Sequence, residues 1–439
     1  MKIGMIAMSG VRAHNEELTK YGLTLPGFVE RSKVIASMPS LSLLTLAALT
    51  PKEFEVDYWE VRDFSDKDSL PTDFDLVAIS TFSAQIYEAY QIADEYRAKG
   101  IPVVMGGLHV TVLPDEAQQH CTTVVVGEGE VLWPKLLADF LNGGLKSRYT
   151  QKPGEDFNLA HSPMPRYDLL NIEKYNRLTV QTSRGCPHRC NFCASSILLT
   201  PKYKVKPIDK VIAEIRYIKS LWPQPFIEFA DDNSFVLRDH YKALLKALKE
   251  ENVHWFTEAD VSIAEDEDLL DLMKESGCRQ VLIGLESPNR GGLENVELRR
   301  NWKQDKQPYY EWAINQIQSR GVSVNGCFIL GLDGDTPEIF DHVYEFVKRT
   351  SLFEVQITVL TPFPGTPLYE QFKREGRLIE DRAWHKCTLF DVNYFPKQMS
   401  VKELEDGITK FSKQIYDKTF IDDRRRQFFR NFRDRQNVL

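Results

Sequence analysis

The chain has 439 residues, of which 42% are hydrophobic, and a formal net charge of −8 at pH 7. This length allows two or three domains with a large core, whereas the acidic balance argues against a general role on nucleic acids or on anionic membrane surfaces. No segment has the composition of a signal peptide or a transmembrane span, so we expect a cytoplasmic protein.

Short apolar runs alternate with segments of helical period in the first third of the chain. The runs cover residues 2–8, 54–59, 76–80, 102–105 and 123–126. Between two of them Ile86, Tyr90 and Ala93 fall on one stripe that ends at Gly100, a residue type common after a helix. Strands alternating with helices predict an α/β fold with a parallel, doubly wound, Rossmann-like sheet, which we assign to residues 1–143.

Small and polar residues follow three of these runs at the ends of the predicted strands. They are Ser80, Thr81 and Ser83 after the third run, Gly106 and Gly107 after the fourth, and Gly127, Glu128 and Gly129 after the fifth. Ligands of doubly wound sheets bind at the carboxyl ends of strands, and glycines there let a flat cofactor approach the backbone. Each turn alone is also an ordinary strand-to-helix turn, but three in register favour a ligand site.

A second repeat begins after a segment of little periodicity, residues 144–176, which predicts a linker. Further apolar runs cover residues 178–182, 226–230, 253–259, 280–285, 322–330 and 354–360. Six parallel strands with outer helices predict a partial (β/α)6 barrel of the TIM type over residues 177–367, open on one side. The chemistry of such barrels lies at the carboxyl ends of the strands.

Three of the seven cysteines follow the first strand of this barrel. Cys186, Cys190 and Cys193 are spaced C-x3-C-x2-C, and three thiolates from one tight loop can hold three corners of a [4Fe–4S] cluster while leaving one iron open. The alternative is a zinc site completed by His188, although the loop would be strained to aim all four groups inward. The other four cysteines are isolated, which suits a reducing compartment and argues against a second cluster.

This loop resembles the signature of the radical S-adenosylmethionine (radical SAM) superfamily, with Phe192 as its aromatic residue. The resemblance implies that S-adenosylmethionine (SAM) chelates the open iron and that an electron from the cluster cleaves it to a 5′-deoxyadenosyl radical. It also implies SAM contacts at the later strand ends: Asp231 and Asp232 at the methionyl amine, Glu286 and Ser287 at the ribose, and Gly331 beside the adenine. Ala230 and Asp231 depart from the superfamily's glycine-glycine-glutamate element, and an Asp-Asp-Asn run is as typical of a turn or helix cap.

The order of segments in residues 1–143 is similar to the cobalamin-binding domain that precedes many radical SAM domains. The turns at 105–109 and 126–130 carry the resemblance. The Asp-x-His-x-x-Gly element that supplies a histidine to cobalt is absent. The resemblance therefore implies base-off cobalamin without a histidine ligand, or a domain that has lost the cofactor. We expect His109, in one of these turns, to hydrogen-bond locally rather than bind cobalt.

Residues 368–439 predict a small, mainly helical extension that closes the barrel. Ser400 and Glu403 are spaced as a capping box at a helix start, and residues 393–396 with Met399 resemble the extension of some cobalamin-associated radical SAM proteins, hopanoid methylase relatives included. We expect the basic, phenylalanine-containing tail 424–433 to be a solvated terminal helix. Contact with anionic lipid or an acidic partner is the alternative.

These features predict a cobalamin-dependent radical SAM enzyme that abstracts hydrogen from an unactivated carbon and methylates it from methylcobalamin. One alternative is a radical SAM enzyme for rearrangement, cyclisation or oxidation without methyl transfer, and another is a non-enzymatic iron–sulfur or zinc protein. The expected partners are a small-molecule or lipid-like substrate and a low-potential electron donor such as flavodoxin or ferredoxin, but not nucleic acid. The sequence identifies neither the substrate nor a catalytic side chain.

Overall fold

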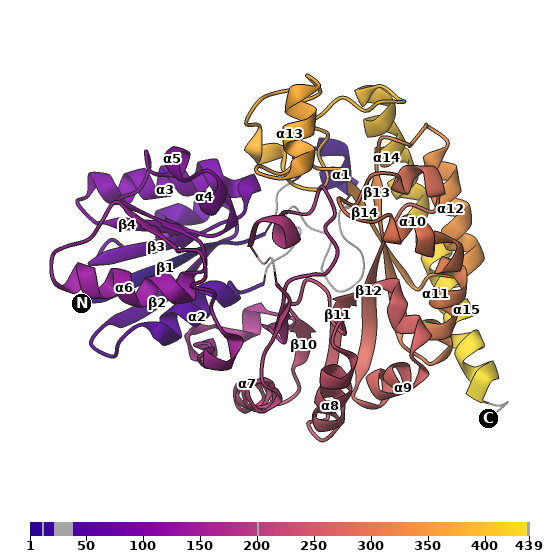
Figure 1. Cartoon of the computed structure of the whole chain (residues 1–439), viewed down its shortest axis with the longest axis horizontal. Coiled ribbons are helices and arrows are strands. Elements are labelled where there is room, and N and C mark those ends of the chain that lie inside the picture. The colour runs from indigo at the N-terminus through magenta and orange to yellow at the C-terminus, as the bar shows by residue number, and fades with distance from the viewer. Residues whose placement is uncertain (11–12, 22–37, 200–201, 437–439) are drawn as a thin grey trace.

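The computed structural model describes residues 1–10, 13–21, 38–199 and 202–436. They form two α/β units, which we call the first unit and the barrel, and a helical extension (Figure 1). Among these residues no helix is long and apolar enough to cross a bilayer.

The first unit is built on six parallel strands in the order β2-β1-β3-β4-β5-β6. Their bounds are β1 (Lys2–Met8), β2 (Glu55–Val61), β3 (Leu76–Ser80), β4 (Val103–Gly106), β5 (Thr123–Val126) and β6 (Arg148–Thr150). Helices α2 (Leu41–Leu49) and α6 (Gly129–Leu141) cover one face of the sheet. Helices α3 (Ile86–Ala98), α4 (Leu108–Val112) and α5 (Pro114–Ala117) cover the other (Figure 1).

Alternate residues of β1 serve separate cores on the two faces of this sheet. Met5 packs with α2 and α6, whereas Ile6 packs with α3. This arrangement confirms the predicted doubly wound sheet, because a strand buried on both faces reads as a continuous apolar run.

Strand β6 lies in the segment predicted to be a linker, and it pairs with β5 at the edge of the sheet. Only Tyr149 of its three residues is buried. A strand this short carries no readable alternation of apolar and polar residues, so the prediction of a linker over residues 144–176 did not include it.

The barrel also has six parallel strands, in the order β14-β13-β12-β11-β10-β7. The strands are β7 (Leu178–Val180), β10 (Phe226–Phe229), β11 (His254–Ala259), β12 (Cys278–Glu286), β13 (Ser323–Leu330) and β14 (Glu354–Val359). The helices are α7 (Ile208–Leu221), α8 (Arg238–Lys249), α9 (Glu267–Glu275), α10 (Trp302–Lys306), α11 (Tyr310–Ser319) and α12 (Ile339–Thr350). Within the described ranges β7 and β14 do not pair with each other, so the barrel is partial, as predicted.

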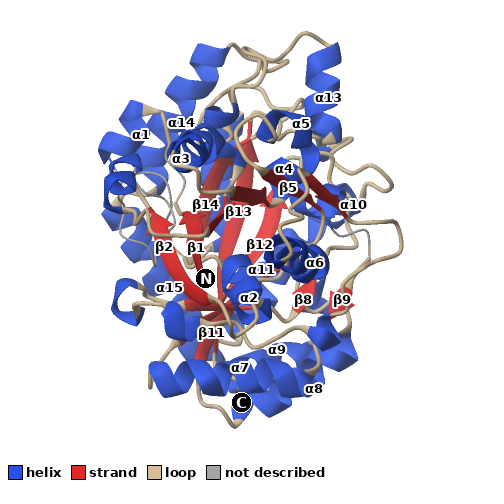
Figure 2. Cartoon of the chain, turned by 90° about the vertical axis from the view of Figure 1, so that its left-hand side faces the viewer, coloured by secondary structure: helices blue, strands red, loops and turns tan. Residues whose placement is uncertain are grey.

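The extension contains α13 (Pro367–Arg374), α14 (Val401–Ile415) and α15 (Lys418–Gln436). Helix α14 begins at the predicted capping box, in which the Glu403 N–H donates to Ser400 Oγ at 3.1 Å and the Ser400 N–H donates to Glu403 Oε2 at 2.7 Å. The N-terminal helix α1 (Glu16–Tyr21) lies close to α14 (Figure 2).

Helix α15 is only partly solvated, which corrects the expectation for the tail. Arg424 is 3% exposed and donates to the carbonyl of Leu352 at 2.7 Å. The ring of Phe428 packs edge-on against Phe353, whereas Phe429 is exposed. One face of the basic helix is therefore docked on the barrel, because its arginine and phenylalanine side chains find partners far away in the sequence.

Candidate functional site

The cysteine loop, residues 185–193, is closed by a two-stranded antiparallel ribbon. Strand β8 (Ser183–Arg184) precedes the loop and β9 (Lys204–Val205) follows it. On its other side, the Asn191 N–H donates to the carbonyl of Val296 at 2.8 Å, and the Leu298 N–H donates to the carbonyl of Arg189 at 2.9 Å. The backbone thus holds the three cysteines in place through hydrogen bonds that do not involve their sulfur atoms.

The three cysteines are free thiols with different exposure. Cys190 is 6% exposed, whereas Cys186 and Cys193 are partly buried. Burial raises the pKa of Cys186 to about 11, so without a metal this thiol stays protonated. No three His, Cys, Asp or Glu side chains of the described chain are grouped as ligands of one metal ion. Each cysteine of a [4Fe–4S] cluster binds a different iron, so three cysteines on one loop fit a cluster better than a mononuclear site.

His188 is engaged by two carboxylates. Its Nε2 lies 3.2 Å from Asp260 Oδ2 and its Nδ1 lies 3.4 Å from Glu297 Oε1. Burial alone would lower the pKa of His188, but the hydrogen bonds to these carboxylates raise it overall. A ring with both nitrogens paired in this way has no lone pair to offer a metal. The contacts therefore argue against the zinc alternative.

Asp231 is a buried acceptor at the end of β10, with 5% of its surface exposed. Burial raises its pKa, although its hydrogen bonds act in the opposite direction. Its donors are the N–H groups of Thr182 and Ser183 (2.8 Å each) and the hydroxyls of Thr182, Ser234 (2.9 Å) and Tyr241 (3.0 Å). The carboxylate therefore ties β10 to the residues that lead into the cysteine loop.

This geometry predicts that Asp231 stabilises the fold rather than contacting SAM. Asp231→Ala leaves several buried donors unpaired and should lower the free energy of unfolding of the barrel by about 3 kcal/mol, whereas Asp231→Asn, which keeps one acceptor oxygen, should cost less. Urea denaturation measures both losses. A pair of variants that are as stable as the wild type but no longer bind SAM would instead support the ligand role.

Asp232 has a different environment from its neighbour. Its Oδ2 accepts from the Gly185 N–H at 2.8 Å and its Oδ1 accepts from the hydroxyl of Ser195. Asn233, the next residue, donates through Nδ2 to Cys186 Sγ at 3.7 Å. Asp232 thus contacts the beginning of the cysteine loop and a residue just after its end, and Asn233 contacts the first cysteine.

The predicted ribose residues lie at the end of β12. Glu286 forms a buried ion pair with Lys303, with a distance of 2.7 Å between Nζ and Oε1. Its φ of 59° lies in the left-handed region, which is strained for a residue other than glycine. Ser287 is fully buried, and its hydroxyl accepts from the Asn289 N–H at 3.2 Å. The buried charge of Glu286 therefore has a partner within the chain, Lys303, and does not require a ribose hydroxyl.

Gly331 and Phe192 are packed against protein groups. Gly331 has a φ of 87°, and a Cβ there would lie 2.1 Å from the Tyr394 hydroxyl, which donates to the Gly331 carbonyl at 2.7 Å. Phe192 is partly buried and packs on the core of the barrel. Tyr394 belongs to the extension, so the extension packs directly against the end of β13.

Glu258 on β11 is a candidate that the sequence analysis missed. Its side chain is exposed on the inner face of the sheet, and the buried Trp255 and Thr257 point to the opposite face of β11. Desolvation and the nearby carboxylates of Glu228 and Asp232 raise its pKa to about 8. A charged residue at an inward position of an apolar strand was the signal that could have found it.

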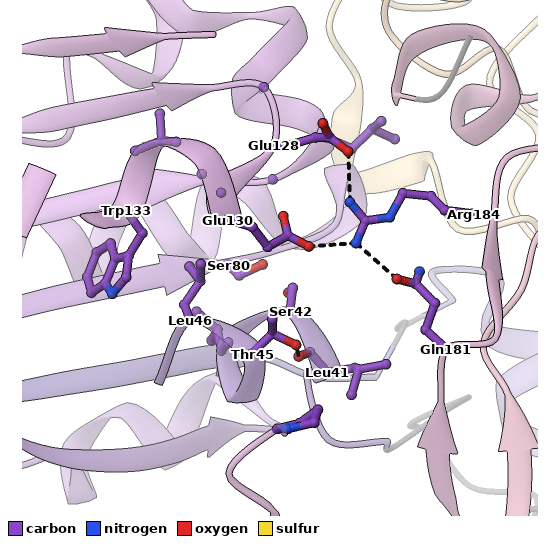
Figure 3. Close-up of a pocket in the computed structure, with 18 of the residues that line it drawn as sticks. Leu41, Ser42, Thr45, Leu46, Ser80, Glu128, Glu130, Trp133, Gln181 and Arg184 are labelled. Atoms are coloured by element: carbon purple, nitrogen blue, oxygen red, sulfur yellow. Dashed lines mark hydrogen bonds and ion pairs between the residues drawn. The ribbon is translucent and has the colours of Figure 1, made fainter. Parts of the chain in front are cut away.

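A cavity of about 350 Å³ lies where the carboxyl ends of strands β3, β4 and β5 meet the beginning of the barrel (Figure 3). From the first unit it is lined by the predicted residues Ser80, Gly106, Gly107, Gly127, Glu128 and Gly129, and from the barrel by Gln181, Arg184, Ser195, Ala230 and Asp232. Helix α2 adds Leu41, Ser42, Thr45 and Leu46. One cavity thus borders both the glycine turns and the residues that hold the cysteine loop.

Two of the glycines are required by their backbone conformation. Gly107 has a φ of 99° and Gly127 a φ of 115°, and a Cβ at Gly127 would lie 2.4 Å from Gln151 Oε1. Because Gly106, Gly107 and Gly127 have no side chains, the backbone itself lines the cavity at these three positions. Such a wall suits a flat macrocycle such as cobalamin.

Thr81 and Ser83 do not line the cavity. The Thr81 hydroxyl donates to the carbonyl of Phe82 at 3.0 Å. Ser83 Oγ lies 3.0 Å from Nδ1 of His109, and Nε2 of His109 lies 3.3 Å from Glu116. His109 is 1% exposed, so it hydrogen-bonds locally, as expected.

Arg184 connects the barrel to the first unit. Its Nη1 donates to Glu128 at 2.9 Å, and its Nη2 donates to Glu130 at 2.6 Å and to Gln181 Oε1 at 2.9 Å (Figure 3). The two glutamates are 56 and 54 residues away in the sequence. No local pattern could have indicated these pairs.

Three family descriptions match the sequence. The Radical SAM superfamily matches residues 180–347, the B12 binding domain matches residues 32–137, and a Domain of unknown function (DUF4070) matches residues 366–438. The first two ranges contain the cysteine loop and the glycine turns, respectively.

Known proteins similar to this chain include methyltransferases. Bacteriochlorophyllide d C-12(1)-methyltransferase of Chlorobaculum tepidum is 30% identical over 87% of this chain and 83% of that protein. Hopanoid C-2 methylase of Rhodopseudomonas palustris is 29% identical over 79% of this chain and 67% of that protein. Among solved structures, the radical SAM methyltransferase TsrM of Kitasatospora setae with cobalamin and a [4Fe–4S] cluster bound has a TM-score of 0.67 at 16% identity, covering 95% of this chain and 89% of that one. This last likeness shows a shared fold.

Proposed function

Because the chain belongs to the cobalamin-dependent radical SAM methyltransferases, we propose that it methylates an unactivated carbon of a small organic or lipid-like substrate held at the mouth of the barrel. The observation that carries this proposal is the cavity shared by the glycine turns and the residues around the cysteine loop. When bound, the cluster supplies the electron that cleaves SAM and cobalamin supplies the methyl group.

Cys186, Cys190 and Cys193 would hold the cluster. The amide of Asn233 is placed to donate to the sulfur of Cys186, and hydrogen bonds to ligating sulfurs are one of the means by which proteins tune such clusters. Asp232 would keep the loop closed through its contacts with Gly185 and Ser195. Asp231 then supports the site from within the core.

The wall formed by Gly106, Gly107 and Gly127 would hold cobalamin, with Ser80, Glu128 and Gly129 beside it. Both ring nitrogens of the buried His109 are already paired. We therefore assign base-off cobalamin without a ligand from His109. In this scheme residues 1–143 hold cobalamin, 177–367 hold the cluster and SAM, and 368–439 close the barrel.

Glu258 would face the substrate. It lies on the inner face of the sheet, and within the described ranges no hydrogen bond or ion pair of its carboxylate is seen. The raised pKa of Glu258 favours the protonated carboxyl group, which can donate a hydrogen bond to an oxygen of the substrate. The substrates named for the relatives, bacteriochlorophyllide d and hopanoids, favour a polycyclic or lipid-like molecule. We propose a low-potential donor such as flavodoxin or ferredoxin and a cytoplasmic setting.

The test begins with protein purified without oxygen after supply of iron, sulfide and hydroxocobalamin. We expect about four irons per chain together with bound cobalt. The protein is then incubated with SAM, a low-potential reductant and candidate tetrapyrrole and hopanoid substrates. Formation of 5′-deoxyadenosine together with S-adenosylhomocysteine supports methyl transfer. Formation of 5′-deoxyadenosine alone supports the alternative of cyclisation or rearrangement, and protein with neither product and no SAM binding overturns the proposal.

A further inference from the structure

Arg184 stands at the junction of the two cofactor regions. We propose that it is a positioning residue, which fixes the cysteine loop against the turn of Glu128 and Glu130 and thereby sets the separation of the two cofactors. This inference rests on the proposed function, since it requires that both cofactors bind. It assigns to Arg184 a task in positioning the cofactors rather than in the chemistry.

The first observation is the direct connection from Arg184 to the cluster ligands. Gly185 follows it with a φ of 101°, a left-handed turn after which the chain reaches Cys186. The Gly185 N–H is held by Asp232 at 2.8 Å. A shift of the Arg184 backbone would therefore move the first cysteine of the loop.

The second observation is the site that the guanidinium occupies on the first unit. Glu128 and Glu130 flank Gly129 at the start of α6, and each binds a different Nη atom of Arg184. The side chain of Arg184 is 19% exposed, and those of Glu128 and Glu130 are 9% and 13% exposed. A planar guanidinium can bind both carboxylates in one fixed orientation, whereas a lysine ammonium would act as a point charge.

The third observation is that the turn itself is anchored. Glu128 Oε2 accepts from the Phe157 N–H at 2.7 Å and from Gln151 Nε2 at 3.0 Å. Glu128 also lies 3.3 Å from Lys204 Nζ, on the ribbon strand that follows the cysteine loop. Arg184 and Lys204 thus attach both strands of the ribbon to the glycine turn that lines the cavity.

The test measures the separation of the cofactors directly and needs no substrate. Anaerobic holoenzyme is reduced so that the cluster and cob(II)alamin are both paramagnetic, and pulsed dipolar electron paramagnetic resonance gives their distance distribution. For the wild type we expect one narrow distribution of the distance between the cluster and cobalamin. For R184Q we expect this distribution to become broader or to shift. E130Q, which removes one of the two ion pairs, should have a smaller effect, and R184K should restore the narrow distribution only in part.

Two comparisons make the test specific. Because Arg184 and Glu130 act through each other, the double variant R184Q/E130Q should be no broader than R184Q alone. R349Q, which removes the exposed ion pair between Arg349 and Glu311 on the far helices, should behave as the wild type.

The outcomes separate this inference from the proposed function. Wild-type protein without cobalt would remove the proposed function and leave no separation to measure. An unchanged narrow distribution in R184Q, with normal iron and cobalt, would overturn the role of Arg184. Should R184Q fail to load iron, E130Q decides, because it leaves every residue of the barrel intact: an unchanged distribution there also overturns the inference.

Discussion

Cys190→Ala is expected to abolish reductive cleavage of SAM. Cys190 is the most buried of the three clustered cysteines, at 6% exposure. The backbone on both sides of it is fixed, because the Arg189 carbonyl accepts from Leu298 and the Asn191 N–H donates to Val296. With only two cysteines left on the loop, the cluster would lose a ligand that no neighbouring side chain can replace. We expect iron content to fall severely and 5′-deoxyadenosine formation to drop below detection.

The matched control is Cys278→Ala. Cys278 is also buried, at 1% exposure, but it lies at the beginning of β12, at the opposite end of that strand from Glu286. Removing its sulfur should cost on the order of 1 kcal/mol of stability and leave the iron content unchanged. Iron analysis and chromatography of the nucleoside products measure both variants. Cleavage of SAM by Cys190→Ala at the wild-type rate would contradict the assignment of the cluster to this loop.

Gly106→Leu is expected to abolish cobalamin binding while leaving the cluster intact. Gly106 ends β4 and lines the cavity, and a Cβ there would lie 3.6 Å from Val125, an ordinary contact. The backbone can therefore accept the substitution, and the rest of the leucine side chain would occupy space that the cofactor needs. We expect the affinity for cobalamin to fall at least ten-fold, which corresponds to about 1.4 kcal/mol of binding free energy or more. The iron content should stay normal.

Gly144→Leu is the control for this substitution. Gly144 follows α6, and a Cβ there would meet only the carbonyl oxygen of Asp139, at 3.7 Å. It should bind cobalt and iron as the wild type does. Equal cobalt content in both leucine variants, measured after reconstitution with hydroxocobalamin, would show that the cofactor does not lie against β4. Loss of iron together with cobalt in Gly106→Leu would indicate misfolding rather than a blocked site.

The strands and the position of the cysteines could be predicted because their signals are local. Buried parallel strands are continuous apolar runs, and the two repeats have different spacing. The three cysteines lie within eight residues, so one loop must bring them together whatever the rest of the chain does. Strand β6 escaped prediction because three residues at a sheet edge carry no such period.

The roles of single polar residues depended on contacts across long stretches of sequence. Asp231 and Asp232 are adjacent and read alike, yet one is buried among donors from residues 182–183, 234 and 241, while the other lines the cavity. Likewise Glu286 needed a partner, but only the packing of α10 against the end of β12 decided that this partner is Lys303.

By itself the sequence determined the order of the two α/β units, the cluster of three cysteines and the glycine turns, because hydrophobic period, cysteine spacing and glycine are properties of neighbouring residues. The tertiary structure alone decided how these parts meet. It paired Arg184 with Glu128 and Glu130, and it placed Glu258 on the inner face of the barrel sheet. It also formed the cavity shared by the two units, from segments that lie far apart in the sequence. Contacts of this kind depend on how complete surfaces fit, and no short pattern encodes them.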